Sequence, residues 1–145
     1  MRAPFGDLCL VSDGNHLLEI RFGRCDIKAD SDLPILTETE KQLSQYFQGK
    51  RQKFEIPLAP AGTMFQRNVW CELEKIEYGA TISYQMLAER TGNNKRSRAV
   101  GNANGKNPIP IIIPCHRVIR KNGDLGGYAG GLKIKKTLLK LEKRK

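Results

Sequence analysis

The first apolar segments of the chain alternate with polar residues in the manner of β-strands. Residues 8–11 and 17–22 are two such segments, and Asp13-Gly14-Asn15 lies between them. An Asp-Gly pair tolerates the positive backbone angles that a tight turn between antiparallel strands requires. The pattern therefore predicts a β-hairpin near the start of the chain.

A helix and one further strand are predicted after this hairpin. Thr37-Glu38-Thr39-Glu40 has the spacing of a capping box, so we expect a helix from there to Gly49. Residues 53–56 are predicted to form the last strand. Pro and Gly between residues 57 and 62 then interrupt both periodicities, which marks a domain junction.

The patterning beyond the junction is helical. Thr63-Met64-Phe65-Gln66 is a second capping box, and it predicts a helix that ends at Gly79. One stripe of this helix is apolar and is expected to form core: Phe65, Val69, Trp70, Leu73 and Ile76. The last helix is predicted over residues 132–143, with Ile134, Leu138 and Leu141 on its apolar face.

Two short helices are predicted between these longer ones. Ser83 caps the first, which Gly92 ends, and a turn at residues 93–95 leads to a basic helix over residues 96–104. A short helix, a turn with glycine and a second helix make a helix-turn-helix, which places its second helix in a groove of DNA. Similar helix pairs occur in proteins that do not bind DNA, so the basic character of the second helix carries the prediction.

Charge is distributed unevenly along the chain. Residues 1–60 hold 8 Lys or Arg against 9 Asp or Glu, a net charge of −1, whereas residues 61–145 hold 17 against 6, a net charge of +11. Within residues 90–136, 11 basic residues are accompanied only by Asp124. This imbalance favours a polyanion-binding surface on the second domain, and nucleic acid is the expected polyanion. Solvated lysines are the alternative, which explains residues 140–145 better than it explains this stretch.

The four cysteines, at positions 9, 25, 71 and 115, lack paired CxxC spacing. We therefore expect reduced thiols and a cytoplasmic location, and neither a disulfide framework nor a metal site. Cys9, His16 and Cys25 are irregularly spaced for zinc, and residues 8–11 are typical of an ordinary strand. The amino terminus has no signal-peptide pattern, and no apolar run is long enough to span a membrane.

Pro114-Cys115-His116-Arg117 combines a nucleophile with a base. It follows the apolar run 109–113, which we interpret as a buried strand. A thiol attacks as its thiolate, so His116 as a base and the positive field of Arg117 and Arg120 favour a reactive Cys115. A buried structural cysteine is the alternative.

The same string belongs to a longer series of motifs. In order these are Phe65-Gln66-Arg67-Asn68-Val69-Trp70, Ile82-Ser83-Tyr84-Gln85-Met86-Leu87-Ala88, Ser97-Arg98-Ala99-Val100-Gly101, Asn107-Pro108-Ile109-Pro110, residues 113–118, and Gly127-Tyr128-Ala129-Gly130-Gly131. Together they closely resemble the O6-alkylguanine-DNA alkyltransferases, also called methylated-DNA–protein-cysteine methyltransferases. The resemblance implies an α/β (α+β) fold: a ribonuclease H-like sheet domain, residues 1–60, followed by a mostly helical helix-turn-helix domain, residues 61–145.

The resemblance also implies how DNA is engaged. The basic helix lies in the minor groove, and Arg98 enters the base stack in place of a flipped nucleotide. Tyr84 crowds the phosphate beside the target and helps to rotate the base out. The implied DNA contacts are Asn93, Lys95, Arg96, Ser97, Arg98, Ala99 and Tyr84. From the residues alone, Arg98 contacts a phosphate or solvent, and Tyr84 is a half-buried core tyrosine.

A pocket and a relay follow from the same resemblance. The implied pocket residues are Tyr84, Asn107, Pro110, Val118, Gly126, Tyr128 and Ala129. Glu142 orients His116, which deprotonates Cys115 through a water, and Tyr84 stabilises the departing guanine. A surface ion pair near residues 143–145 is the alternative for Glu142, and an ordinary Asn-Pro turn is the alternative for Asn107.

The implied reaction is direct-reversal repair: one alkyl group, typically methyl, moves from O6-alkylguanine in double-stranded DNA to Cys115, and each molecule reacts once. O4-alkylthymine is a second candidate substrate. No metal or organic cofactor is needed, and we expect a monomer, with cooperative DNA binding left open. A cysteine hydrolase is disfavoured because Cys115 and His116 are adjacent, and an alkyl-lesion sensor is disfavoured because such relatives lack this cysteine.

Overall fold

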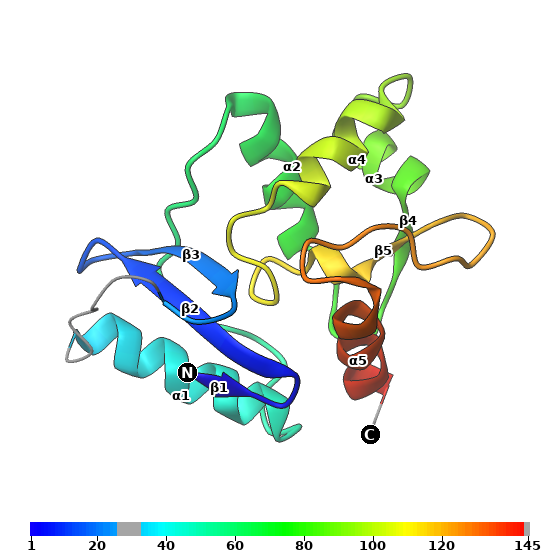
Figure 1. The fold of residues 1–145 in the computed structure, drawn as a ribbon. Helices are drawn as coiled ribbons and strands as arrows, with labels where there is room; N and C mark the ends of the chain where they lie inside the picture. The colour runs from blue at the N-terminus through cyan, green and yellow to red at the C-terminus, as the bar shows by residue number, and fades with distance from the viewer. Residues whose placement is uncertain (26–32, 144–145) are drawn as a thin grey trace.

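The amino-terminal strands form the predicted hairpin. In the computed structural model, which describes residues 1–25 and 33–143, three antiparallel strands lie in the order β1 (Arg2–Ala3), β2 (Gly6–Ser12) and β3 (Leu17–Phe22) (Figure 1). The turn between β2 and β3 depends on Asp13, whose Oδ1 accepts the backbone N–H groups of Asn15 and His16 at 2.8 and 2.7 Å. Gly14 takes φ +98°, the left-handed conformation expected for this turn.

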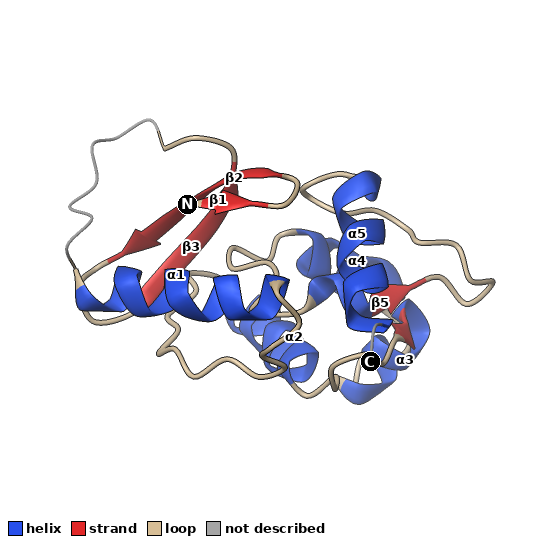
Figure 2. Ribbon diagram, turned by 90° about the horizontal axis from the view of Figure 1, so that it is seen from below, coloured by secondary structure: helices blue, strands red, loops and turns tan. Residues whose placement is uncertain are grey.

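Helix α1 (Pro34–Phe47) packs against β2 and β3 (Figures 1 and 2). It begins earlier than the predicted start at Thr37, so that expectation was wrong. Pro34 suits the first turn of a helix, where its missing N–H would have no partner anyway. Thr37 and Thr39 lie inside the helix, and their hydroxyls donate to the carbonyls of Leu33 and Ile35 rather than capping an end.

Residues 53–56 do not form the predicted strand. The backbone N–H of Glu55 donates instead to Oε1 of Gln42 on α1, at 2.9 Å. A single isolated bridge follows, in which the Leu17 N–H donates to the Pro57 carbonyl and the Ala59 N–H to the Leu17 carbonyl. Side-chain pairing with a helix has replaced the expected ladder, and only the bridge ties this segment to the sheet.

The second half contains the predicted helices. Helix α2 (Met64–Glu74) opens with the Thr63–Gln66 capping box and ends before Gly79, while Ser83 caps α3 (Tyr84–Arg90) by accepting the Met86 N–H at 3.0 Å. Helix α4 (Ser97–Gly105) follows α3 across the turn of the helix-turn-helix. The indole N–H of Trp70 donates to the Ala103 carbonyl at 2.8 Å, which fixes α2 against α4.

The apolar run before Cys115 is a buried turn, not the expected strand. Two prolines, Pro110 and Pro114, lack the N–H groups that a central strand needs. The Ile113 N–H donates to the Ile109 carbonyl at 3.0 Å, and Ile111 has a positive φ of 76°. Cys115–Arg117 then form one turn of 3-10 helix, η1.

A two-stranded parallel sheet and the last helix complete the fold. Strand β4 (Ile82–Ser83) pairs with β5 (Val118–Ile119), and α5 (Leu132–Lys143) has the predicted bounds. The described part of the chain, which excludes residues 26–32 and 144–145, has no helix long and apolar enough to cross a membrane.

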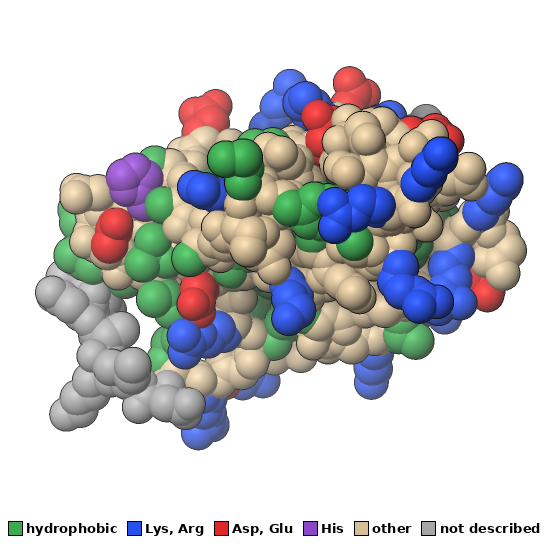
Figure 3. All heavy atoms as spheres, turned by 90° about the horizontal axis from the view of Figure 1, so that it is seen from above, with side chains coloured by type: hydrophobic (Ala, Val, Ile, Leu, Met, Phe, Trp, Pro, Cys, Tyr) green, Lys and Arg blue, Asp and Glu red, His purple; other side chains and the backbone are tan. Residues whose placement is uncertain are grey.

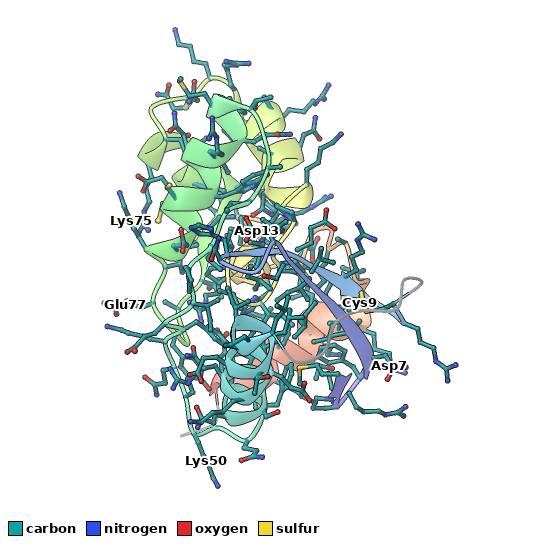
Figure 4. The ribbon with its side chains drawn as sticks, turned by 90° about the vertical axis from the view of Figure 1, so that its left-hand side faces the viewer. Asp7, Cys9, Asp13, Lys50, Lys75 and Glu77 are labelled. Atoms are coloured by element: carbon teal, nitrogen blue, oxygen red, sulfur yellow. A yellow bond between two sulfur atoms is a disulfide. The ribbon has the colours of Figure 1, made fainter. Side chains whose placement is uncertain are left out.

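Two of the four cysteines are joined in a disulfide, so the expectation of reduced thiols was wrong for them. Cys9 lies on β2, and Cys25 follows β3 with its Cα 5.0 Å from that of Cys9 (Figure 4). Within the hairpin Cys9 pairs with Arg21, and the chain beyond β3 brings Cys25 to Cys9 across a sequence separation of 16. Cys71 and Cys115 are free thiols.

Candidate active site

Cys115 is the first residue of η1, directly behind the buried turn. Only 5% of the residue is exposed. Burial raises the pKa of its thiol to about 11, although a hydrogen bond with Asn107 and the positive charge of Lys135 oppose the rise. The thiol is therefore protonated near neutral pH and needs a base before it can attack.

Asn107 braces the turn that presents Cys115. Its Nδ2 donates to the Ile113 carbonyl at 2.7 Å, and its Oδ1 accepts the Ile109 N–H at 2.9 Å. The side chain thus spans the apolar run from one end to the other. Besides making an Asn-Pro turn, Asn107 holds the chain just before the thiol.

His116 is hydrogen-bonded to Glu142 of α5. Nε2 of the imidazole lies 2.6 Å from Oε2 of the carboxylate, and neither side chain is more than 1% exposed. Burial by itself raises the pKa of Glu142, but hydrogen bonds from His116 and Arg117 lower it to about 2. Burial lowers the pKa of His116. Near neutral pH the pair is therefore an ionised carboxylate and a neutral imidazole.

These charge states determine which nitrogen of His116 carries the proton. An ionised carboxylate only accepts hydrogen bonds, so we assign the proton to Nε2. Nδ1 then holds a lone pair, and it has no hydrogen-bond partner within residues 1–25 and 33–143. The residue next to Cys115 consequently carries a buried base with a free lone pair.

Glu142 is a buried member of a network rather than half of a surface ion pair. Its Oε1 accepts from Nε of Arg117 at 2.8 Å and its Oε2 from Nη2 at 3.0 Å, while Nη1 of the same arginine donates to the Ile76 carbonyl at 2.6 Å. Arg117 therefore pairs with the Glu142 carboxylate. The positive charge that acts on the Cys115 thiol comes from Lys135, not from Arg117 as expected. Of the expected surface partners at residues 143–145, Lys143 is exposed and Arg144 and Lys145 lie outside the described residues.

Lys135 is a site residue that the apolar pattern of α5 did not predict. It is fully buried, and its Nζ donates to the carbonyls of Val118, Leu125 and Gly127. Burial lowers the pKa of this amine to about 8. The lysine ties α5 to the loop that follows β5. Its spacing from Leu138 and Glu142, three and seven residues, was the available signal, because such positions share one helix face.

A hollow of about 420 Å³ brings together several of the predicted pocket and DNA-binding residues. It is lined in part by Tyr84, Ser97, Arg98, Tyr128 and Ala129. Asn107, Pro110 and Val118 are buried and do not line it. A larger hollow of about 640 Å³, between residues 52–58 and 74–78, contains none of the predicted pocket residues, so we assign no site to it.

Gly126 fits closely against Tyr84. A Cβ atom at this glycine would lie 2.6 Å from the Tyr84 hydroxyl, and its φ is +71°. Burial raises the pKa of Tyr84, so its hydroxyl keeps its proton near neutral pH. The absence of a side chain at Gly126 leaves room for the Tyr84 ring. The Tyr84 hydroxyl, which keeps its proton, can act as a hydrogen-bond donor.

An aromatic residue of the amino-terminal sheet supports Tyr128, which lines this hollow. Phe22 of β3 packs edge-to-face on Tyr128, with ring centroids 5.8 Å apart. A Cβ at Gly130 would lie 2.9 Å from the Phe22 ring. The hydroxyl of Tyr128 is buried and has no partner among the residues that the structure describes. Contact from Phe22 was not foreseen, since the two rings are far apart in sequence.

The basic residues of the helix-turn-helix are mostly exposed. Lys95, Arg96, Ser97 and Arg98 face solvent. Arg96 also lies over the Phe65 ring, 4.8 Å from its centroid. Figure 3 shows the molecule from above the view of Figure 1. On that face, Lys and Arg side chains gather mainly on the part away from the β2–β3 hairpin.

Two predicted DNA contacts are less accessible. Ala99 is half-buried, and Asn93 is half-buried with its Nδ2 donating to the Thr91 carbonyl at 3.0 Å. Arg98 is the exposed basic residue of α4 that also lines the hollow.

Family models match both halves of the chain. The model described as "6-O-methylguanine DNA methyltransferase, ribonuclease-like domain" matches residues 1–60, and the one described as "6-O-methylguanine DNA methyltransferase, DNA binding domain" matches residues 64–144.

Individual relatives agree with these models over nearly the whole chain. A methylated-DNA–protein-cysteine methyltransferase of Methanosarcina acetivorans is 45% identical, covering 97% of this chain and 94% of its own. The constitutive enzyme of that name from Bacillus subtilis is 49% identical, covering 97% and 91%. The solved structure of Mycobacterium tuberculosis OGT in complex with DNA is 41% identical, covers 99% of this chain and 90% of its own, and superposes with a TM-score of 0.89.

Proposed function

Because the chain belongs to the 6-O-methylguanine DNA methyltransferase family, we propose that it repairs DNA by direct reversal, moving an alkyl group from guanine O6 to Cys115. The observation that carries the assignment to Cys115 is the adjacent His116, whose Nε2 is held by Glu142 at 2.6 Å while Nδ1 keeps a free lone pair. A buried thiol beside such a base fits a nucleophile better than a structural cysteine.

The reaction is a displacement at the alkyl carbon. His116 takes the proton of the Cys115 thiol, and the thiolate attacks the carbon bound to O6. A carbon–sulfur bond forms as the carbon–oxygen bond breaks, and the electron pair of that bond leaves with the guanine, which finally takes up the proton. Tyr84 donates a hydrogen bond to the guanine as negative charge develops on it.

DNA is the partner, and α4 is its proposed contact. The mixed α/β fold places an exposed Arg98 at the edge of the hollow lined by Tyr84 and Tyr128. A base inside a duplex is unreachable until it leaves the stack, so we assign Arg98 to the space that the flipped nucleotide leaves. The net charge of +11 over residues 61–145 supports binding through phosphates.

Several finer features belong to the same proposal. The alkylated guanine in duplex DNA is the substrate, the division at residues 60 and 61 separates two domains, and the protein acts as a monomer. Its substrate implies a location with the DNA, in agreement with the cytoplasmic expectation.

Each protein molecule is expected to transfer one alkyl group, because a thioether has no easy hydrolytic exit. With a duplex carrying radiolabelled O6-methylguanine in rising excess, label on the protein should level off at one methyl group per chain. Cys71, the other free thiol, is exposed and is not expected to accept a methyl group. Continued turnover beyond one equivalent would contradict the proposal.

Arg98→Ala is expected to slow transfer from duplex DNA on the order of a hundred-fold, since unstacking a base costs a few kcal/mol without a side chain to replace it. Transfer from free O6-benzylguanine, which needs no flipping, should change less than about two-fold. Single-turnover rates on the two substrates measure the difference. Arg90→Ala is the matched control, because Arg90 is exposed on α3 and does not line the hollow. Equal losses on both substrates would assign Arg98 to the pocket or the fold.

A further inference from the structure

The first domain donates a hydrogen bond to the carboxylate that holds His116. Tyr46 lies near the carboxyl end of α1, which points toward α5 in Figure 1, and it is fully buried. Its hydroxyl donates to Oε2 of Glu142 at 2.6 Å, across a separation of 96 residues. The same oxygen lies 2.6 Å from Nε2 of His116.

The position of the Tyr46 hydroxyl is fixed by its surroundings. Three aromatic rings pack around that of Tyr46, with centroid separations of 5.5 Å for Phe47, 5.4 Å for Phe54 and 6.1 Å for Tyr78. Burial raises the pKa of Tyr46. The phenol therefore stays protonated over the working range of the protein and remains a donor.

The donors around Glu142 are shared unequally between its two oxygens. Oε1 accepts from Nε of Arg117 at 2.8 Å and from the Gly79 N–H at 3.4 Å. Oε2 accepts from Tyr46, His116 and Nη2 of Arg117. Without the Tyr46 hydroxyl, His116 would share Oε2 only with a guanidinium nitrogen at 3.0 Å, and the carboxylate would be free to turn toward Arg117.

We propose that Tyr46 is a positioning residue for alkyl transfer: through Glu142 it holds the His116 imidazole with Nε2 protonated and Nδ1 available to Cys115. The inference rests on the proposed function. It makes the first domain a contributor to the hydrogen-bond network of the site, in addition to its packing against the second domain.

Tyr46→Phe tests this assignment, since it removes one hydroxyl and keeps the ring. The single-turnover rate on free O6-benzylguanine near neutral pH is expected to fall on the order of ten-fold, the effect of losing one hydrogen bond to a charged group. The final yield should stay at one alkyl group per chain. The yield measures the fraction of protein that is folded, whereas the rate measures how fast each folded molecule reacts. Tyr78→Phe is the matched control: its ring packs in the same cluster, but its hydroxyl lies 3.4 Å from the Leu141 carbonyl and does not contact Glu142.

The pH profile separates positioning from stability. Groups that act on the titration of His116 are Glu142 and Lys135 from α5 and Arg117 from η1. Tyr46→Phe leaves all of them in place. Its deficit should shrink as pH rises toward the Cys115 pKa of about 11, where solvent can deprotonate the thiol without His116. A loss that is the same at every pH and matches a loss of yield would make Tyr46 purely structural and overturn the inference.

Two further measurements make the test independent of that rate alone. If Tyr46 acts through Glu142, adding Tyr46→Phe to Glu142→Gln should cost less than two-fold more, whereas independent effects would multiply. Nitrogen NMR of His116 should show one tautomer in the wild type and a mixture in Tyr46→Phe.

An unchanged tautomer in Tyr46→Phe would overturn the inference. A wild-type protein that transfers no alkyl group would refute the proposed function instead, and the NMR comparison would still decide the role of Tyr46.

Discussion

Cys115→Ser is expected to reduce alkyl transfer below detection while duplex affinity stays within about two-fold of the wild type. Serine keeps the shape of the side chain, but its hydroxyl ionises far less readily than a thiol whose pKa is already raised to about 11 by burial. His116 cannot make up that difference. Radiolabel transfer and a binding titration on the same methylated duplex measure the two quantities.

Cys71→Ser is the control for Cys115→Ser, because Cys71 is the other free thiol and is exposed. Its transfer rate should equal that of the wild type. If transfer persisted in Cys115→Ser and disappeared only when Cys71 was also replaced, Cys71 would be the nucleophile and the assignment to Cys115 would be wrong.

Replacing Glu142 is expected to damage both chemistry and stability. Glu142→Gln should lower the transfer rate by about 10²–10⁴, the usual contribution of a positioned general base, since the amide no longer fixes the His116 tautomer. Glu142→Ala should in addition destabilise the fold by about 3–5 kcal/mol, because it leaves the buried Arg117 charge without its partner. Denaturant unfolding and single-turnover rates measure these effects separately.

The pH dependence of stability gives Glu142 a second signature. Its pKa is lowered from an ordinary 4.5 to about 2, so the unfolded chain binds the proton more readily. The resulting stability is fully present above about pH 4.5 and is lost as pH falls through about 2. Glu142→Gln should flatten the unfolding free energy across that window. An unchanged slope would show that the carboxyl is not ionised in a buried network.

Short-range signals in the sequence predicted much of the fold. Capping boxes and turn residues act within a few residues of where they occur, which is why the hairpin at Asp13, the start of α2 at Thr63 and the cap of α3 at Ser83 were correct. The start of α1 was wrong because two signals competed there. Pro34 begins a helix as readily as the Thr37 pattern does, and Thr37 then lies within the helix.

Long-range contacts account for the parts that were not predicted. Nothing local indicates that Tyr46 would reach Glu142 or that Phe22 would pack on Tyr128. Lys135 was not singled out from the sequence, since a lysine is rarely fully buried without partners. Its partners are the backbone carbonyls of Val118, Leu125 and Gly127, which only the folded chain brings together.

Two other predictions were also wrong. Apolar residues 109–113 have the composition of a strand, but the neighbouring prolines remove the N–H groups for a ladder, and this should have outweighed composition. Cys9 and Cys25 were expected to be reduced because their spacing matches no framework. The hairpin register places Cys9 opposite Arg21. Cys25 meets Cys9 only through the path of the chain beyond β3, so the disulfide was not visible from the sequence.

The most direct test of the account locates the alkyl group on the protein. Wild-type protein is incubated with a duplex containing one O6-methylguanine, digested, and mapped by mass spectrometry. We predict one added methyl group per chain, carried on the peptide that contains Cys115, and unmodified guanine restored in the DNA. Methyl on any other residue, or restored guanine with no methyl on the protein, would contradict the account.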